Sequence, residues 1–589
     1  MKFKFLCLAL AVMMMLAVLT GCAGNNTGVE DIANEAKRET QTLVVYLISE
    51  TEVSEQVTSD IEDAINRITK SAYKTQLDLH FFTEDKYYEA VEDKFEDKEN
   101  ELKKIEKEQN EKKKIEKALR ESCKKAGVSY IAPTTPKQET IITEEQTLVN
   151  EEYGTIEYVY PEPTSSQLDI FYVGGYDKYM EYMYNEWLAD LKEELTTTSK
   201  QLNEHINGVY MSNIDTEGGI YGIPTNSVVG EYTWMLLDKS LMDDYLFTAD
   251  SINSITDENL FRFLAEVKAN EKDVDPAVGN INPSNVYYWS VGAEGRLTNE
   301  NSLLCGSYEI DQVIGVDSYP DMTTIFHDSN YTSQMRAIKR MEWEGYLINP
   351  DAADYEPGPA AVKFINGGYE VYAENHYDPE NGLNGNYYVK MLARPRAEVD
   401  DIFAHMICVN ALEDNVARSM EIVTSININS EVRNILQYGV EGENYWIDES
   451  GVLHRYNDTY MMDINKTGNV FTAHPEEGLR ADYWDYAIQQ NTDALIVPLF
   501  GLNLDEFTLD TESLNAFNGL YDEYMAKLNA CTSVSELDAF FDESRKTLAN
   551  DENYKIIKSG SYADFEEGEP APLYAIYFQW LLNNKYTTN

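Results

Sequence analysis

Apolar residues follow one another without interruption over 42–48, where the chain reads Thr-Leu-Val-Val-Tyr-Leu-Ile. A run of this length, rich in β-branched residues, is typical of a strand that is covered on both faces. Similar runs predict strands over 77–82 and 168–173, and helical spacing of the apolar residues predicts helices over 53–72 and 177–195. Because strands and helices alternate, the pattern predicts an α/β domain with a largely parallel sheet.

A long polar stretch separates the second and third of these strands. Residues 84–126 are dominated by Glu and Lys, which indicates a long, mostly solvated helix or a helical hairpin that bends at 109–113. A return rich in Pro, Thr and Glu covers 131–166. We interpret 84–165 as a helical arm inserted into the α/β domain, either a surface decoration or an arm that docks a partner.

The later part of the chain alternates in the same way. A short, glycine-bounded strand over 219–226 leads into an aromatic strand over 231–239, which we expect to cross to another part of the molecule. Helical spacing recurs at 257–269, 331–346, 398–426 and 430–439. The segment 503–589 indicates a helical C-terminal region, and the chain has no internal repeat.

The first residues have the pattern of a secretory signal. A basic start precedes an apolar run over 5–19, which is too short and wrongly flanked for a transmembrane helix. The following Leu-Thr-Gly-Cys, which ends at Cys22, resembles the bacterial lipobox, whose cysteine is diacylated and becomes the new N-terminus. We therefore expect 1–21 to be a lipoprotein signal peptide and Cys22 to carry the lipid (palmitate). The alternative is an ordinary signal peptide followed by an incidental cysteine.

This interpretation makes 22–41 a solvated tether. The protein is then expected on the outer face of the bacterial cytoplasmic membrane, anchored by its lipid.

Charge and cysteine spacing narrow the list of partners. The formal net charge is −56, from 47 basic and 103 acidic residues, which excludes nucleic acid and leaves the membrane contact to the lipid. The cysteines beyond Cys7 and Cys22 are too far apart for a zinc site, and both disulfides and free thiols remain open for them. They are Cys123, Cys305, Cys408 and Cys531.

Catalytic motifs are missing from the sequence. The seven histidines never form HExxH, and there is no G-x-S-x-G elbow, P-loop or G-x-G-x-x-G loop. No acid pair suited to glycoside cleavage is singled out among the 103 carboxylates. The oxygen-rich stretch 378–386 departs from the EF-hand pattern, so we favour a Gly/Asn turn over a Ca²⁺ loop. We predict no catalytic residue, no metal and no cofactor, and hence no enzyme.

Aromatic residues indicate a different chemistry. The chain has 42 tyrosines and 7 tryptophans, many of them next to glycine. Aromatic faces stack on sugar rings, whose hydroxyls bond to Asp, Glu and Asn, although most tyrosines of a large protein lie in its core or on its surface.

Four stretches together carry a family resemblance. They are the lipobox with the strand 43–48, the segments 168–175 and 219–226, and the segment 429–445, in which a helix ends before a glycine turn and an aromatic residue. The chain resembles the extracellular solute-binding lipoproteins of bacterial ABC importers, of the large family 1 type associated with carbohydrates. The arm and the tail after about 503 depart from the family pattern.

The resemblance implies a fold of the type II periplasmic-binding-protein kind, with two α/β lobes, crossing strands and a ligand in the interlobe cleft. The helical arm and the helical C-terminal region are additions to it. We expect lobe 1 over 42–235 plus about 390–430, and lobe 2 over about 236–389 plus 431–589.

Candidate ligand-binding residues follow from the rule that such sites lie at the carboxyl ends of strands. For Trp234 and Tyr372, the alternative is packing at the hinge. The candidates are Ser49, Glu50, Gly174, Gly175, Tyr176, Asn226, Tyr232, Trp234, Trp289, Tyr372 and Tyr445.

Three functions stay open at this stage. The first is a membrane-tethered receptor that captures a sugar, an oligosaccharide or another small solute and delivers it to the permease subunits of an ABC transporter. The second is a surface ligand-sensing protein that docks a signalling partner through its arm, and the third is a surface glycoside hydrolase. Peptides and polyols also suit an acidic, aromatic cleft.

Overall fold

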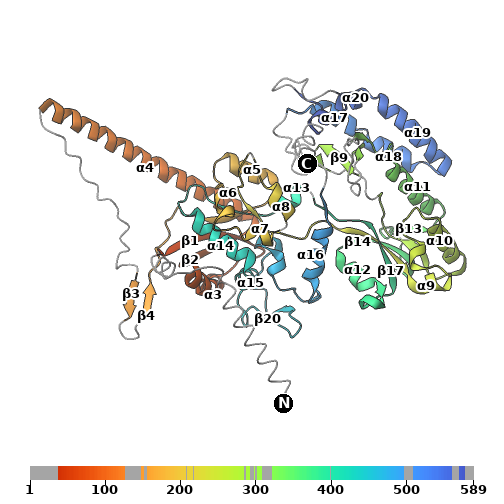
Figure 1. The fold of residues 1–589 in the computed structure, drawn as a ribbon, viewed down its shortest axis with the longest axis horizontal. Coiled ribbons are helices and arrows are strands. Elements are labelled where there is room, and N and C mark those ends of the chain that lie inside the picture. Colours follow the sequence, from red (N-terminus) through yellow and green to blue (C-terminus); the bar gives the residue numbers. More distant parts are fainter. Residues whose placement is uncertain are drawn as a thin grey trace, which may run out of the picture.

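Two five-stranded sheets, each flanked by helices, form the two lobes of the protein (Figure 1). They confirm the predicted α/β class with two lobes, a helical arm and a helical C-terminal region. The computed structural model describes residues 38–126, 147–150, 155–206, 208–216, 218–283, 287–291, 297–298, 302–307, 321–353, 355–397, 399–496, 508–559 and 570–577. No helix in these ranges is both long and apolar enough to cross a membrane.

Lobe 1 is built on a sheet with the strand order β2-β1-β5-β19-β6. Its strands are β1 (Gln41–Ser49), β2 (Thr75–Thr83), β5 (Ile170–Val173), β6 (Ile223–Pro224) and β19 (Met406–Val409). β1 pairs in parallel with β2 and β5, as predicted, but β19 is antiparallel to both β5 and β6. The sheet is therefore mixed rather than largely parallel, because β19 enters from lobe 2.

Helices cover both faces of this sheet, and β1 is almost completely buried. The helices of lobe 1 are α3 (Glu55–Tyr73), α5 (Tyr176–Tyr184), α6 (Lys192–Thr196), α7 (Leu202–His205), α8 (Gly208–Asn213), α13 (Val399–Phe403), α14 (Val416–Ile428) and α15 (Ser430–Tyr438). The predicted helix 177–195 breaks after α5, because the chain turns there to bond to β19: the Ala189 N–H donates to the Val409 carbonyl at 2.9 Å.

The arm is a single continuous helix, α4 (Glu84–Ala126), so the hairpin alternative is wrong. Its first turns pack on the lobe 1 sheet, where Tyr87, Val91 and Phe95 are completely buried. Its later turns leave the body of the protein, as Figure 1 shows. A short hairpin of β3 (Thr147–Asn150) and β4 (Thr155–Tyr158) belongs to the return.

Lobe 2 contains a sheet with the order β13-β8-β14-β7-β17. Its strands are β7 (Tyr232–Asp238), β8 (Asp275–Val278), β13 (Leu347–Ile348), β14 (Ala360–Gly367) and β17 (Tyr387–Ala393), and its helices are α9 (Lys239–Asp244), α10 (Glu258–Asn270), α11 (Ser329–Trp343) and α12 (Tyr369–Asn375). A second core joins β9 (Tyr287–Val291), β10 (Leu297–Thr298), β11 (Leu304–Ser307) and β12 (Asp321–Thr324) to α17 (Thr511–Asn518), α18 (Tyr521–Asn529), α19 (Val534–Asn550) and α20 (Glu552–Ile557).

The predicted lobe boundaries need correction. α15 and the segment after it belong to lobe 1, since Val432, Leu436, Tyr460 and Met462 lie in its core. β7 and β17 both belong entirely to the sheet of lobe 2, whereas the predicted lobe boundaries fell inside each of these strands. The sequence pattern identified these elements but not their partners, because each element has apolar residues that either lobe could bury.

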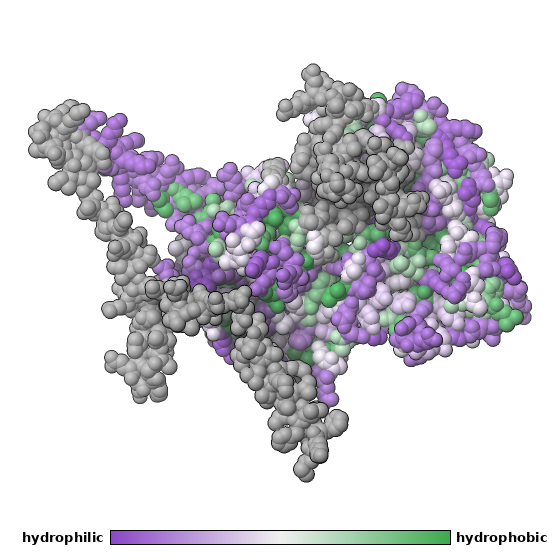
Figure 2. All heavy atoms as spheres, viewed as in Figure 1, coloured by the Kyte–Doolittle hydropathy of each residue, from purple (hydrophilic) through white to green (hydrophobic). Residues whose placement is uncertain are grey.

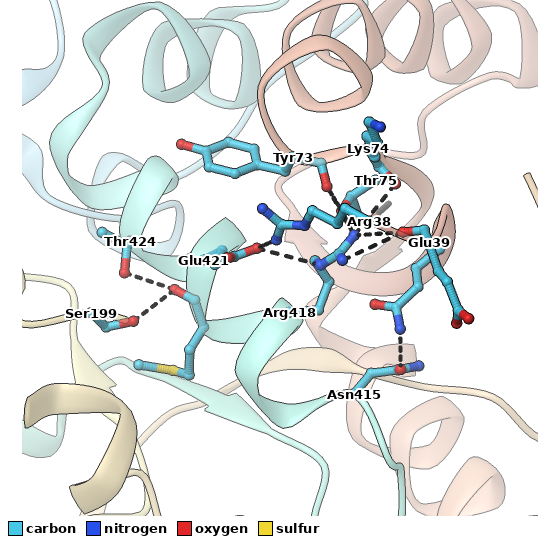
Figure 3. Close-up of polar contacts among 12 residues, drawn as sticks. Arg38, Glu39, Tyr73, Lys74, Thr75, Ser199, Asn415, Arg418, Glu421 and Thr424 are labelled. Atoms are coloured by element: carbon cyan, nitrogen blue, oxygen red, sulfur yellow. Dashed lines mark hydrogen bonds and ion pairs between the residues drawn. The ribbon is translucent and has the colours of Figure 1, made fainter. Parts of the chain in front are cut away.

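The start of the described chain is fastened to lobe 1 at the amino end of its strands (Figure 3). From α14, Arg418 donates to the Tyr73 carbonyl at 2.8 Å and to the Thr75 hydroxyl at 3.0 Å. Arg38 pairs with Glu421 of the same helix. The chain therefore enters lobe 1 at the sheet edge opposite to the carboxyl ends of β1, β2 and β5.

One helix, α16 (Tyr483–Asp493), lies between the two lobes (Figure 1) and bonds to the segments that cross between them. The Gln490 side chain donates to the Val229 carbonyl at 3.1 Å, and the Asn491 side chain accepts from the Val229 N–H at 3.0 Å. On the lobe 2 side, Arg394 donates to the Asp493 carbonyl at 2.6 Å. α16 thus holds both crossing segments in one hydrogen-bonded unit.

Candidate functional site

A polar cavity of about 530 Å³ lies at the carboxyl ends of β1 and β2. The segment that contains the short helix η4 (Ile464–Lys466) closes one side of it. We call it the rim cavity, and its lining residues are Ile48, Ser49, Glu50, Thr83, Glu84, Asp85, Asp463 and Lys466. Parallel strands bring their carboxyl ends to one edge, which is why residues from distant parts of the chain meet here.

Ser49 is the residue of the rim cavity with an unmet bonding requirement. Its side chain is 3% exposed, and its hydroxyl is buried without a hydrogen-bond partner in the described part of the chain. Such a group costs about 1–3 kcal/mol of desolvation unless a partner is supplied. A ligand hydroxyl that entered the rim cavity would be such a partner.

Charges in the rim cavity are unbalanced. Lys466 lies 3.0 Å from the Glu84 carboxylate and 3.9 Å from that of Asp463, and the lining set contains Glu50 and Asp85 as well. Four carboxylates therefore face a single ammonium among the lining residues. This arrangement accepts hydrogen bonds from hydroxyl or amino groups and disfavours an anionic ligand.

A buried arginine positions the segment that contributes Asp463 and Lys466. Arg433 of α15 is completely buried and donates to the Ile464 carbonyl at 2.8 Å and to the Asn469 carbonyl at 3.2 Å. Burial lowers the pKa of Arg433 to about 10, so it remains charged near neutral pH. These bonds fix the backbone on both sides of Lys466.

Gly174 and Gly175 lie at the same sheet edge, at the end of β5. The Gly174 N–H donates to the Tyr88 hydroxyl at 2.9 Å, and a Cβ at Gly174 would lie 3.1 Å from that oxygen. Gly175 is exposed and has a φ of +87°, which favours glycine. His405 lies beside Gly174: burial lowers the pKa of its imidazole, and the Lys466 charge lowers it as well.

The structure thus brings Ser49, Glu50, Gly174 and Gly175 to one edge of lobe 1. Two neighbouring candidates are engaged in packing instead. Tyr176 is 7% exposed, and its ring centroid lies 5.1 Å from that of Phe403. Asn226 is buried and donates to the Asn469 side chain at 3.0 Å and to the His205 carbonyl at 3.2 Å.

The aromatic candidates of the crossing strand pack within lobe 2. Tyr232 is completely buried and donates to the Asp493 carboxylate at 2.8 Å, while Trp234 donates to the Gly368 carbonyl at 3.1 Å. The half-buried Tyr372 ring stacks on His376, with centroids 4.5 Å apart. Packing beside the hinge, the alternative for Trp234 and Tyr372, agrees with these contacts and extends to Tyr232.

Two candidates lie away from the rim cavity. Tyr445 lines another cavity, of about 450 Å³, between α3, α15 and the strand β20 (Tyr445–Ile447) of lobe 1, so its predicted place in a second lobe is wrong. Trp289 lies in β9, where its backbone pairs with Leu304, but its side chain is outside the described part. Cys22 lies outside the described residues, and so does the side chain of Cys123.

The described part of the chain can be compared with the predictions for metals and cysteines. No group of three His, Cys, Asp or Glu side chains there could hold a metal ion. In the stretch 378–386, the Asp378 carboxylate accepts from the Asn381 side chain at 2.6 Å, as in a turn. Cys305, Cys408 and Cys531 form no disulfide with one another.

Comparison with known proteins gave a structural likeness only. No family model matches the chain, and no curated protein matches it. The solved structure of the N-glycan transport solute binding protein NgtS from Streptococcus pneumoniae aligns with 93% of this chain and 100% of its own, at a TM-score of 0.52 and 15% identity. The chain has the fold of a solute-binding protein.

Two further solved structures align over most of the chain at lower TM-scores. One is an HMO-binding, ABC-transporter-associated solute-binding protein from Bifidobacterium longum infantis, with a TM-score of 0.44, 10% identity, and 92% and 98% of the two chains covered. The other is the substrate-binding protein FusA from S. pneumoniae in complex with kestose, with a TM-score of 0.39, 11% identity, and coverage of 92% and 99%.

Several residues that line the rim cavity were not predicted from the sequence. Thr83 and Glu84 follow the second predicted strand, so the rule that selected Ser49 and Glu50 would also have found them. Asp463 and Lys466 gave no such signal, because they lie in an irregular segment whose place depends on Arg433.

Proposed function

We propose that this protein is a membrane-tethered extracellular receptor that captures a sugar or oligosaccharide between its lobes and delivers it to an ABC permease. No bond is made or broken in this function. The lipid at Cys22 would hold the protein at the outer face of the membrane. The ligand would contact the rim cavity of lobe 1 first and be enclosed when the lobes close about the segments bonded to α16.

The observation that carries the proposal is the buried, unpartnered Ser49 hydroxyl in a cavity rich in carboxylates. A sugar offers several hydroxyl groups that donate and accept at once, which matches both the hydroxyl and the acids. The likeness to an N-glycan transport solute binding protein supports the same class of ligand. The charges of the rim cavity favour neutral sugars over sulfated or other anionic ones.

A thermal-shift screen of residues 23–589 against oligosaccharides, peptides and polyols tests the proposal. A ligand at a hundred times its Kd adds about 2.7 kcal/mol to the free energy of unfolding, which a melting curve resolves. A shift with the sugar recovered intact supports the receptor. A shift with the sugar consumed supports a glycoside hydrolase, and no shift with any sugar contradicts the proposal.

Ser49→Ala is expected to weaken sugar binding by about 0.5–1.5 kcal/mol, because the variant lacks the hydroxyl that would bond to the ligand. The free energy of unfolding should stay unchanged or rise, since a buried unpartnered hydroxyl is removed. Isothermal titration and urea unfolding measure the two quantities. Thr233→Ala, at an exposed hydroxyl of lobe 2 that bonds to Asn366, is the matched control. Equal affinity of the Ser49→Ala and unaltered proteins would remove Ser49 from the site.

A further inference from the structure

The outer part of α4 differs in charge from the rest of the protein. Residues 102–126 contain ten basic and five acidic side chains, a net charge of +5. The remainder of the chain has 37 basic and 98 acidic residues, a net charge of −61. We call residues 102–126 the distal arm. The strongly negative net charge of the whole chain therefore hides one basic segment.

The distal arm is a solvated surface over the length where its side chains are described. Leu102, Ile105 and Ile115 are 40%, 42% and 61% exposed, and every lysine from Lys103 to Lys117 is exposed. Figure 2 shows this part of α4 as a hydrophilic projection away from the body. A helix of 25 residues is about 37 Å long, and charges are screened over about 8 Å at physiological salt. The acidic body therefore does not cancel the potential at the far end of the distal arm.

The lysines of the distal arm lie all around the helix. Lys103, Lys107, Lys114 and Lys117 are spaced by four, seven and three residues, which places them on one face of a helix. At the same 100° per residue, Lys104 and Lys112 lie on the other side, with Ile105 and Ile115. A helix with a net charge of +5 and exposed lysines on all sides suits the surface of an anionic bilayer, where lysines meet the lipid headgroups.

The position of the arm agrees with a membrane contact. α4 leaves lobe 1 at the amino end of the strands, where Lys98 pairs with Glu413, the residue four positions after β19, at 3.0 Å. The described chain also begins at this edge, since Arg38 pairs with Glu421 there. The distal arm and the start of the chain thus leave lobe 1 on the same side, and the rim cavity opens on the opposite side.

We propose that the distal arm binds the surface of an anionic phospholipid membrane. Contact there would orient lobe 1 with its amino edge toward the bilayer and its rim cavity away from it. The inference goes beyond the proposed sugar receptor, because it does not depend on the ligand.

Vesicle sedimentation of the unacylated chain, residues 23–589, tests this inference. Binding to vesicles of phosphatidylcholine and phosphatidylglycerol at about 7:3 should exceed binding to pure phosphatidylcholine at least tenfold, and about 500 mM NaCl should abolish it. The variant Lys107→Glu, Lys114→Glu, Lys117→Glu should bind at least tenfold more weakly. The matched control, Lys272→Glu, Lys527→Glu, Lys546→Glu, changes the same charge at exposed sites of lobe 2 and should bind as the unaltered protein does.

Equal binding to both vesicle types would overturn the inference, and so would equal losses in the arm variant and the control. Analytical ultracentrifugation distinguishes the other partner that the charges allow, the acidic body of a second copy. A chain that self-associates without vesicles, and an arm variant that does not, would also overturn the membrane assignment. Circular dichroism of both variants should match that of the unaltered protein, because every substituted lysine is exposed on a helix or loop.

Discussion

Phe95→Ala is expected to lower the free energy of unfolding by about 3–5 kcal/mol, as for other buried aromatic residues cut to alanine. Phe95 is completely buried where α4 crosses the lobe 1 sheet. Its ring stacks on Trp187, with centroids 4.4 Å apart and an angle of 3° between the planes, and meets Phe171 of β5 edge-on at 5.3 Å. The substitution would leave a cavity lined by the rings of Trp187, Phe171 and Tyr182.

Ile115→Ala is the control on the same helix. It removes apolar atoms from a side chain that is 61% exposed, so the free energy of unfolding should change by less than about 0.5 kcal/mol. Urea unfolding followed by circular dichroism measures both variants. A loss below about 1 kcal/mol for Phe95→Ala would mean that the first turns of α4 are not part of the lobe 1 core.

The sequence predicts those elements that local residue patterns determine, and it fails where contacts between distant residues decide the structure. The runs 42–48 and 77–82 are strands as predicted, since continuous apolar character is a local property. Whether 84–126 is one helix or two was not decided by the sequence, because its sparse apolar residues suit both. Its buried half is fixed by contacts such as Phe95 with Trp187, which involve residues 92 positions apart in the chain.

The candidate site divides in the same way. Ser49, Glu50, Gly174 and Gly175 could be selected because they directly follow predicted strands, and the structure brings them to one sheet edge. Tyr232 and Trp234 also follow a recognisable pattern, but both are buried and hydrogen-bonded, Tyr232 to Asp493 of α16 and Trp234 to Gly368 of lobe 2. An aromatic residue near a hinge has the same sequence signature whether it binds a ligand or packs, so only the tertiary contacts separate the two roles.

The lobe assignment of α15 was wrong for a related reason. Its helical pattern was correctly predicted, but its partners in lobe 1 come from segments far away in sequence. Gln437, for example, donates to the Met462 carbonyl at 2.6 Å from inside the core. A buried polar network of this kind leaves no periodic signal along the chain.

Asp169→Asn is expected to raise the free energy of unfolding near neutral pH, which is the opposite of the usual effect of a core substitution. Asp169 is completely buried beside β1, where it accepts from the Val44 N–H at 2.8 Å and from the Gln167 side chain at 2.7 Å. Burial and, to a smaller extent, the nearby Glu413 together raise the pKa of Asp169 to about 6, against the effect of these two hydrogen bonds. The folded protein therefore holds a charged carboxylate at pH 7 in an environment that favours the neutral acid.

The sign follows from proton binding. With an unfolded pKa of 3.8 and a folded pKa of about 6, the folded state binds the proton more tightly. Stability from this group is fully present below pH 3.8 and is lost as the pH rises through about 6, by about 3 kcal/mol in total. Asparagine cannot ionise and its amide oxygen can still accept from Val44, so the variant should keep that stability at pH 7.

Urea unfolding at about pH 7.5 and at about pH 3.5 tests this expectation. The variant should be more stable than the unaltered protein by about 3 kcal/mol at the higher pH, and the two should be equal at the lower pH. Asp522→Asn, at an exposed position of α18, should leave stability unchanged at both. If Asp169→Asn instead destabilises the protein at pH 7.5, the carboxylate charge stabilises the strand pair through Val44 and Gln167, and its hydrogen bonds outweigh its burial. The pH dependence separates these two accounts, because a lost packing contact would cost the same at both pH values.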